Sequence, residues 1–208
     1  MLKAIIYDLD HTLFDPHTID KGIFNFVFKF LKENQKVAQE DIEHDFFTIS
    51  LNAFIEKHVE TSIHEAFVEI LRTIPPLGKL NLYESEVPVC KDGITNYLVT
   101  SGLREYQNNK IDSLGIRNWF AEIFIDDPFE SMWTDKQEIF EYIIQSYNYK
   151  PKELLIVGDN PNSEIAAGNR LGITTIQILR KGIQAAKNAD FHMKSVGEVN
   201  EYILEHSV

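Results

Sequence analysis

The stretch Lys3–Leu13 reads KAIIYDLDHTL, and it decides how the rest of the chain is interpreted. Its apolar run, Ala4–Tyr7, stops abruptly at acidic residues, a pattern that predicts a short buried strand. Asp8 and Asp10 follow one residue apart, so they face the same side if the strand period persists. Two unpaired carboxylates near a core are costly, and a magnesium ion bound by their oxygens would offset that cost. A surface turn or helix cap is the structural alternative for this pair.

Similar apolar runs recur further along the chain. They lie at Thr95–Val99, Glu122–Ile125, Leu154–Val157 and Thr174–Ile178, and a short edge strand is expected at Ala189–Met193. Most of these runs are followed by turn residues and then by a helical pattern. Strands that alternate with helices favour a parallel sheet covered on both faces. The sequence therefore predicts an α/β fold with a Rossmann-like parallel sheet core, helices on both faces and an inserted α-helical cap.

The inserted module is predicted from a long interruption between the first two strands, roughly residues 15–90. A single crossover helix needs far fewer residues. Three apolar stripes at helical spacing lie near residues 19–31, 42–54 and 63–74, and Pro75-Pro76 ends the last one. The expected division is a core domain of residues 1–14 and 91–208 and a helical cap domain of residues 15–90.

A second acidic loop follows the predicted strand Leu154–Val157. Gly158 permits a tight backbone there, Asp159 comes next, and Glu164 begins a helical pattern five residues later. A turn followed by a helix cap is the local alternative. The first motif favours a functional role for the second, because ligands bind beyond the carboxyl ends of strands in open parallel sheets.

Two further positions suit a phosphate group. Thr100, Ser101 and Gly102 end the second predicted strand with hydroxyl groups and exposed amides before a helix, which suits phosphate oxygens. Lys136 begins the helical pattern that precedes Asp159, and a phosphoryl site needs such a fixed positive charge. A helix cap and a solvated surface lysine are the structural alternatives.

These pieces, in this order and on these elements, resemble the haloacid dehalogenase-like superfamily of phosphotransferases over nearly the whole chain. The four motifs of that superfamily are matched in turn by Asp8, Asp10 and Thr12, by Thr100, by Lys136, and by Gly158, Asp159 and Glu164. The resemblance implies that the insertion between the first and second motifs is a cap that closes over a small substrate. True dehalogenases lack the aspartate found at Asp10, so its presence favours phosphoryl transfer.

The resemblance also implies a mechanism with a role for each residue. Asp8 attacks phosphorus and becomes an aspartyl-phosphate, while Asp10 protonates the leaving alcohol and then activates water. The implied cofactor is Mg²⁺, held by Asp8, the backbone carbonyl of Asp10, and Asp159. The implied phosphate-binding groups are Thr100, Ser101, Gly102 and Lys136, supported from behind by Thr12 and Glu164.

Three alternatives stay open beside a phosphatase. A phosphomutase would use the same fold and the same aspartyl-phosphate. A phosphonate hydrolase needs a cap lysine that forms a Schiff base, and the candidates are Lys21, Lys29, Lys32, Lys36 and Lys57. A non-catalytic binding module is disfavoured because the chain retains the acidic and hydroxyl positions of the motifs.

Composition bounds the setting of this activity. The 208 residues are 44% hydrophobic and 25% charged, as in soluble globular proteins. The net charge of -12 disfavours nucleic acid and anionic membrane as partners. With no signal peptide or membrane-length apolar run, a cytoplasmic monomer or homodimer is expected, acting on a small phosphorylated metabolite. Positions considered for substrate specificity are His17, Thr18, Asp20 and Arg104, although a structural role is favoured for each.

Overall fold

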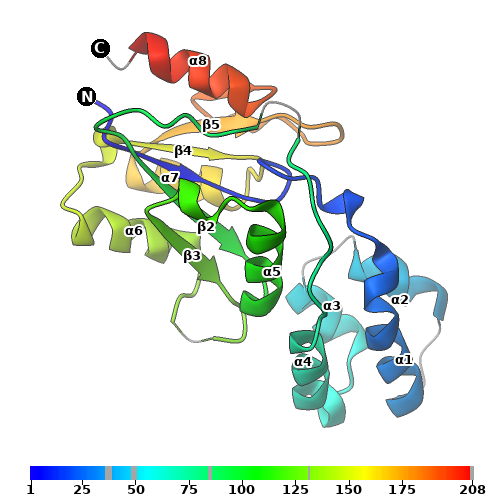
Figure 1. The fold of residues 1–208 in the computed structure, drawn as a ribbon. Helices are drawn as coiled ribbons and strands as arrows, with labels where there is room; N and C mark the ends of the chain where they lie inside the picture. Colours follow the sequence, from blue (N-terminus) through cyan, green and yellow to red (C-terminus); the bar gives the residue numbers. More distant parts are fainter. Residues whose placement is uncertain (36–38, 48–50, 84–85, 131, 207–208) are drawn as a thin grey trace.

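Six parallel strands form one sheet in the computed structural model, which describes residues 1–35, 39–47, 51–83, 86–130 and 132–206. Their spatial order is β3-β2-β1-β4-β5-β6, so β1 lies inside the sheet (Figure 1). The predicted α/β fold is confirmed, and each predicted strand ends within two residues of its expected bounds. The strands are β1 (Ala4–Tyr7), β2 (Thr95–Ser101), β3 (Glu122–Asp126), β4 (Leu154–Gly158), β5 (Thr174–Ile178) and β6 (Phe191–Met193).

Helices cover both faces of the sheet, as the sequence predicts. The alternation along β1 shows the reason: Ile5 and Tyr7 belong to one buried cluster, and Ala4 and Ile6 belong to the other. The first cluster also contains side chains of α5 and α8, and the second contains side chains of α6 and α7. These helices are α5 (Arg104–Leu114), α6 (Lys136–Ser146), α7 (Glu164–Leu171) and α8 (Val196–His206).

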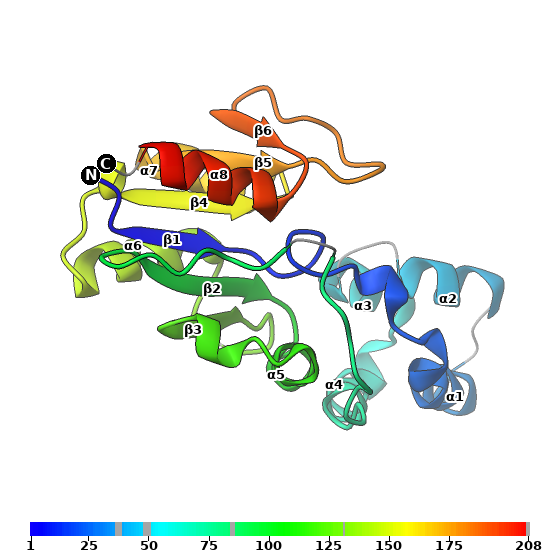
Figure 2. The same ribbon diagram turned by 45° about the horizontal axis from the view of Figure 1, so that its top comes forward.

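Four helices form a separate group between β1 and β2. They are α1 (Asn25–Asn34), α2 (Gln39–Phe46), α3 (Leu51–His58) and α4 (His64–Arg72). Figure 2 shows the group beyond the end of the sheet toward which the strand arrows point. The middle apolar stripe corresponds to two helices, α2 and α3, and residues 48–50 between them lie outside the described part of the chain. Short 3₁₀ turns lie at Pro16–Thr18, Lys21–Phe24, Thr61–Ile63, Arg117–Trp119 and Pro151–Glu153.

Aromatic rings hold the four-helix group together. The ring of Phe46 lies 5.1 Å from those of Phe24 and Phe54 and 5.4 Å from that of Phe28, all edge to face. These contacts place the aromatic rings in the core of the helical group. Buried side chains of this group belong to the same cluster as one face of the sheet, so the two parts share apolar packing.

Two segments connect the helical group to the sheet, and they lie side by side. Phe14 on the outgoing segment forms an antiparallel bridge with Leu82 on the returning one, and the Tyr83 amide donates to the Leu13 carbonyl at 3.1 Å. The last cap helix ends at Arg72, and the described residues from there to Thr95 contain no helix. The predicted domain division at residues 14/15 and 90/91 stays a prediction. The described residues 73–90, the last part of the predicted cap domain, contain no helix.

Within the described residues, no helix combines the length and the apolar character needed to cross a membrane.

Candidate active site

The predicted motif residues meet at one edge of the sheet because the strands are parallel and in register. Tyr7 pairs with Leu98 of β2 and with Val157 of β4, which brings the carboxyl ends of three neighbouring strands together. Asp8 follows β1 directly, and its amide donates to the Val157 carbonyl at 2.9 Å. The site therefore lies at the strand ends, where open parallel sheets bind ligands.

Lys136 is the cation at the centre of this edge. Its ammonium lies 2.6 Å from Asp8 Oδ1 and 3.0 Å from Glu164 Oε2. All three side chains are buried, so each charge depends on the others for compensation. Burial lowers the pKa of Lys136, but Asp8 and Glu164 raise it more, and the lysine stays protonated. The predicted assignment of Lys136 is therefore supported by geometry: it begins α6 behind the N-cap Asp135 and contacts the predicted nucleophile.

Three carboxylates crowd around that single ammonium. Oxygens of Asp8, Asp159 and Glu164 all lie within 4.8 Å of one another. Burial raises the pKa of Asp8, Lys136 lowers it and Glu164 raises it again, to about 7. For Asp159, burial and then the charges of Asp8 and Glu164 raise the pKa to about 8. This oxygen-only donor set with excess negative charge fits a hard divalent cation such as Mg²⁺.

Gly158 is required by the way Glu164 reaches the site. A Cβ atom at Gly158 would lie 2.3 Å from Cγ of Glu164 and 2.5 Å from its Oε1, distances that no side chain tolerates. Glu164 thus folds back over the end of β4, where its Oε1 accepts the Asn160 amide at 2.6 Å. The second acid of the loop is thereby directed toward Lys136, and its supporting role in the site stays a prediction.

The predicted phosphate-binding strand end is partly engaged with its neighbours. Thr100 is buried, and its hydroxyl accepts from Gln107 Nε2 at 3.1 Å. The Ser101 hydroxyl donates to Asp126 Oδ2 at 3.0 Å, and the Gly102 amide donates to the Asp126 carbonyl at 2.9 Å. The Gly102 amide therefore donates within the protein in this structure. The expected roles of Thr100, Ser101 and Gly102 toward phosphate stay predictions.

Asp10 is held by two residues that the sequence reading missed. Lys110 Nζ lies 2.9 and 2.7 Å from its two carboxylate oxygens, and Gln107 Nε2 lies 3.2 Å from Oδ2. Both side chains come from α5 and are buried. Their spacing of three residues places them on one helix face, which is the only signal that could have found them.

Arg180 fixes the loop that carries the first motif. Its guanidinium donates to the backbone carbonyls of His11 at 3.2 Å and Thr12 at 2.7 Å, and it pairs with buried Glu86 at 2.8 Å. The Thr12 side chain is fully buried, and its hydroxyl has no hydrogen-bond partner among the described residues. Thr12 therefore supports the loop by packing, and no motif in the sequence pointed to Arg180.

A cavity of about 490 Å³ opens between the sheet and the helical group. The sheet side contributes Asp10, Ser101, Gly102, Gln107 and Lys110, and the helical side contributes mainly apolar residues, namely Ile19, Phe24, Phe46, Phe47, Leu51, Leu71 and Ile74. Asp8, Lys136 and Asp159 are not among its lining residues. A substrate in this cavity would therefore meet Asp10 and the end of β2 directly.

The positions considered for substrate specificity fall into two groups, one at the cavity and one with structural contacts. His17 lines the cavity. Thr18 donates to the Asp15 carbonyl at 2.7 Å, Asp20 caps a 3₁₀ turn, and Arg104 pairs with Glu130 at 2.8 Å, so these three are structural. Among the described cap lysines, only Lys21 lines the cavity, whereas Lys36 lies outside the described residues.

Comparisons with known proteins agree with this geometry. A family model described as haloacid dehalogenase-like hydrolase matches residues 2–172. A glyceraldehyde 3-phosphate phosphatase of Methanocaldococcus jannaschii is 25% identical, over 98% of this chain and 97% of that protein.

Solved structures show the same fold. A haloacid dehalogenase-like family hydrolase from Streptococcus pneumoniae superposes with a TM-score of 0.70 at 19% identity, over 97% of this chain and 98% of that one. A putative beta-phosphoglucomutase from Thermotoga maritima gives 0.62 at 15% identity, over 99% and 100%. With the four motifs gathered at one sheet edge, the chain belongs to the haloacid dehalogenase-like hydrolases and is a hydrolase of phosphate esters.

Proposed function

We propose that this chain hydrolyses a small phosphate monoester with Mg²⁺, through an aspartyl-phosphate formed at Asp8. The observation that carries the proposal is the group of Asp8, Asp159 and Glu164, whose oxygens lie within 4.8 Å of one another around Lys136. Three buried or half-buried carboxylates against one ammonium leave an uncompensated negative charge. A divalent cation and a substrate phosphate fit together at such a place.

Each residue then has a defined role in the proposed reaction. Asp8 supplies the attacking carboxylate oxygen, and Lys136 beside it offers positive charge to the phosphoryl oxygens. Asp10 gives a proton to the leaving oxygen and later takes one from the attacking water. Asp8, Asp159 and the Asp10 carbonyl would hold Mg²⁺, which when bound offsets repulsion between the carboxylates and the phosphate. Thr100 and Ser101 lie at the strand end where the remaining phosphate oxygens are expected.

The substrate class follows from the cavity and from the relatives. A cavity of about 490 Å³ beneath the helical group suits a small phosphorylated metabolite better than a protein. The curated relative from Methanocaldococcus jannaschii makes glyceraldehyde 3-phosphate the first ester to test. A cytoplasmic location and a monomeric or homodimeric state stay predictions.

The test compares wild type with Asp8→Asn on a panel of phosphate esters, with Mg²⁺ and with chelator. We expect phosphate release only from wild type with Mg²⁺, and a loss of at least about a thousandfold in Asp8→Asn, because nucleophile removal leaves only binding effects. Undiminished release by Asp8→Asn would overturn the nucleophile. Transfer of phosphate between two positions of one sugar, without release, would favour a phosphomutase instead.

A further inference from the structure

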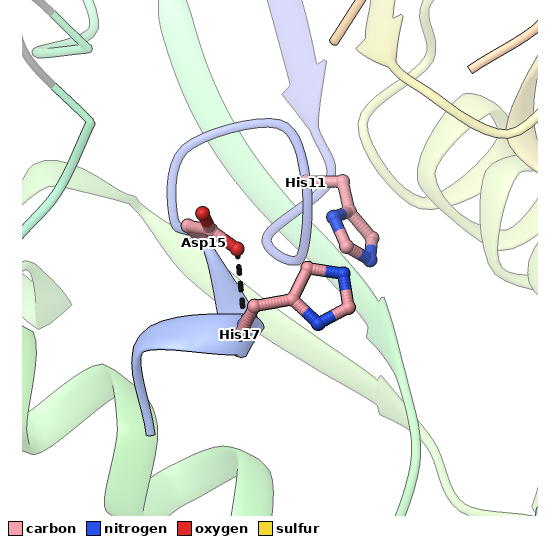
Figure 3. Close-up of side chains that lie close together, drawn as sticks. All are labelled: His11, Asp15 and His17. Atoms are coloured by element: carbon pink, nitrogen blue, oxygen red, sulfur yellow. Dashed lines mark hydrogen bonds between the residues drawn. The ribbon is translucent and has the colours of Figure 1, made fainter. Parts of the chain in front are cut away.

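A second group of three metal-ligating side chains lies beside the cavity and away from the Asp8 group. It consists of His11, Asp15 and His17, and Figure 3 shows their side chains gathered on the loop after β1. One ligand atom from each lies within 4.8 Å of the others. The centroids of the two imidazole rings lie 5.2 Å apart, and the ring planes are tilted by 54°. We call these residues the histidine cluster.

Backbone hydrogen bonds hold the loop that presents this cluster. Asp15 Oδ1 accepts the His17 amide at 2.9 Å (Figure 3), and the His11 amide donates to the Phe14 carbonyl at 2.7 Å. Arg180 binds the His11 carbonyl from across the fold at 3.2 Å. The backbone of this loop is thus held in place. To bind a common ion, the three residues would need to move only their side chains.

Hydrogen bonds to other described side chains do not account for the cluster. Within the described residues, neither His11 nor His17 shows a hydrogen bond from an imidazole nitrogen. One Asp15 carboxylate oxygen caps the 3₁₀ turn, and a carboxylate keeps several further lone pairs for another partner. His17 is exposed, and His11 and Asp15 are half-buried, so an ion can reach the donors.

The donor types select a class of ion. Imidazole nitrogens with one carboxylate suit Zn²⁺ and related transition metals, whereas Mg²⁺ prefers oxygen alone. With bonds of about 2.0–2.2 Å, tetrahedral zinc needs ligand atoms roughly 3.3–3.5 Å apart. The three ligand atoms lie within 4.8 Å of one another, so binding would require the side chains to move closer together. We propose that His11, Asp15 and His17 bind one Zn²⁺ at the cavity wall, separate from the predicted Mg²⁺ site.

The position of the histidine cluster at the cavity indicates what a bound ion could contact. Both histidines line the cavity, so a zinc ion held by three protein ligands would have its fourth position available to water or to an oxygen of a cavity ligand. None of the three side chains is assigned to the predicted Mg²⁺ site, so the two ions would not compete for a ligand side chain.

The experiment titrates Zn²⁺ into the folded full chain by isothermal calorimetry in the presence of excess Mg²⁺. We expect one zinc per chain, with affinity reduced at least about tenfold by His17→Ala and by His11→Asn. Asparagine is chosen at position 11 because His11 has a φ of 59°, a conformation that Asn adopts readily. His17 is exposed, so its replacement does not endanger the fold.

Two matched variants separate this site from other binding. His64→Ala removes an exposed histidine of α4, and Asp159→Asn removes a predicted Mg²⁺ ligand; both should keep the zinc affinity of wild type. Cobalt substitution, read as visible absorption of a tetrahedral ion, should likewise vanish in His17→Ala. Zinc affinity that survives His17→Ala, or no binding by wild type at millimolar zinc, would overturn the site. Neither result bears on phosphate release by Asp8.

Discussion

Lys110 on α5 donates hydrogen bonds to both carboxylate oxygens of Asp10, at 2.9 and 2.7 Å, although the two residues lie 100 positions apart in the chain. The lysine side chain is only 4% exposed, and its ammonium also lies 4.5 Å from the centre of the Tyr106 ring. A buried ammonium that contacts the proposed acid and base fixes where that carboxylate points. The position of Asp10 thus depends on a helix outside the four motifs.

Replacement of Lys110 by Met should lower kcat at least about tenfold while KM changes little, because a misplaced general acid loses part of its contribution of about 10²–10⁴. Steady-state kinetics on the best ester measures this, with a thermal melt to show that the variant is folded. Lys152→Met, at an exposed lysine far from the site, is the control. An unchanged kcat would mean that Asp10 is positioned without Lys110.

Gly158→Ala should destabilise the protein by about 1–3 kcal/mol and impair catalysis, because the added Cβ would lie 2.3 Å from Glu164 Cγ and push that side chain off Lys136. Urea denaturation measures the change. Gly78→Ala is the matched control, since a Cβ there has no atom within 4 Å. Equal stability of the two variants would contradict the placement of Glu164 over the end of β4.

The metal-free protein should lose stability as pH rises. Asp8 and Asp159 have pKa values of about 7 and 8 in the folded state, above the ordinary 3.8, so the folded chain binds more protons than the unfolded chain between those values. For these two groups, stability is therefore full below about pH 4, declines as pH rises above that value, and levels off once pH has passed the folded pKa values of about 7 and 8. Thermal melts in chelator from pH 5.5 to 8.5 measure this trend.

Addition of Mg²⁺ should reverse the loss at pH 8, because the ion compensates the ionised carboxylates. At a hundred times its dissociation constant, a ligand adds about 2.7 kcal/mol, or roughly 5–10 °C in Tm for a chain of this size. Asp159→Asn should show a weaker pH trend and a smaller gain from Mg²⁺. A melting temperature that changes with neither pH nor Mg²⁺ would contradict the proposed ion site.

Arg180→Ala should lower the free energy of unfolding by about 1–3 kcal/mol, because it removes donors to the His11 and Thr12 carbonyls and leaves buried Glu86 without its cation. Arg180→Lys should recover less than half of this loss, since an ammonium lacks the planar fork of a guanidinium. Chemical denaturation compares both with Arg117→Ala, which breaks an exposed pair with Asp112 and should cost under about 1 kcal/mol. Full recovery by lysine would show that charge alone matters.

The strands and the motif positions could be predicted from the sequence. Short, continuous apolar runs that stop near Asp8, Thr100 and Asp159 carry their information locally, in a few adjacent residues. The parallel order of the strands then brings these ends to one edge without further detail. Lys136 was found in the same way, because it begins a helix whose apolar period is plain in the sequence.

The residues that surround that edge of the sheet could be identified only from the tertiary structure. Gln107, Lys110 and Arg180 reach Asp10 and its loop from elements 97 to 169 residues away, and the rotation of α5 and the course of the chain after β5 determine those contacts. It also showed that the Gly102 amide donates to the Asp126 carbonyl, and that ligand atoms of the histidine cluster lie within 4.8 Å of one another. Local periodicity fixes which face of an element is apolar, but the partner of a polar side chain depends on long-range packing, which no short pattern encodes.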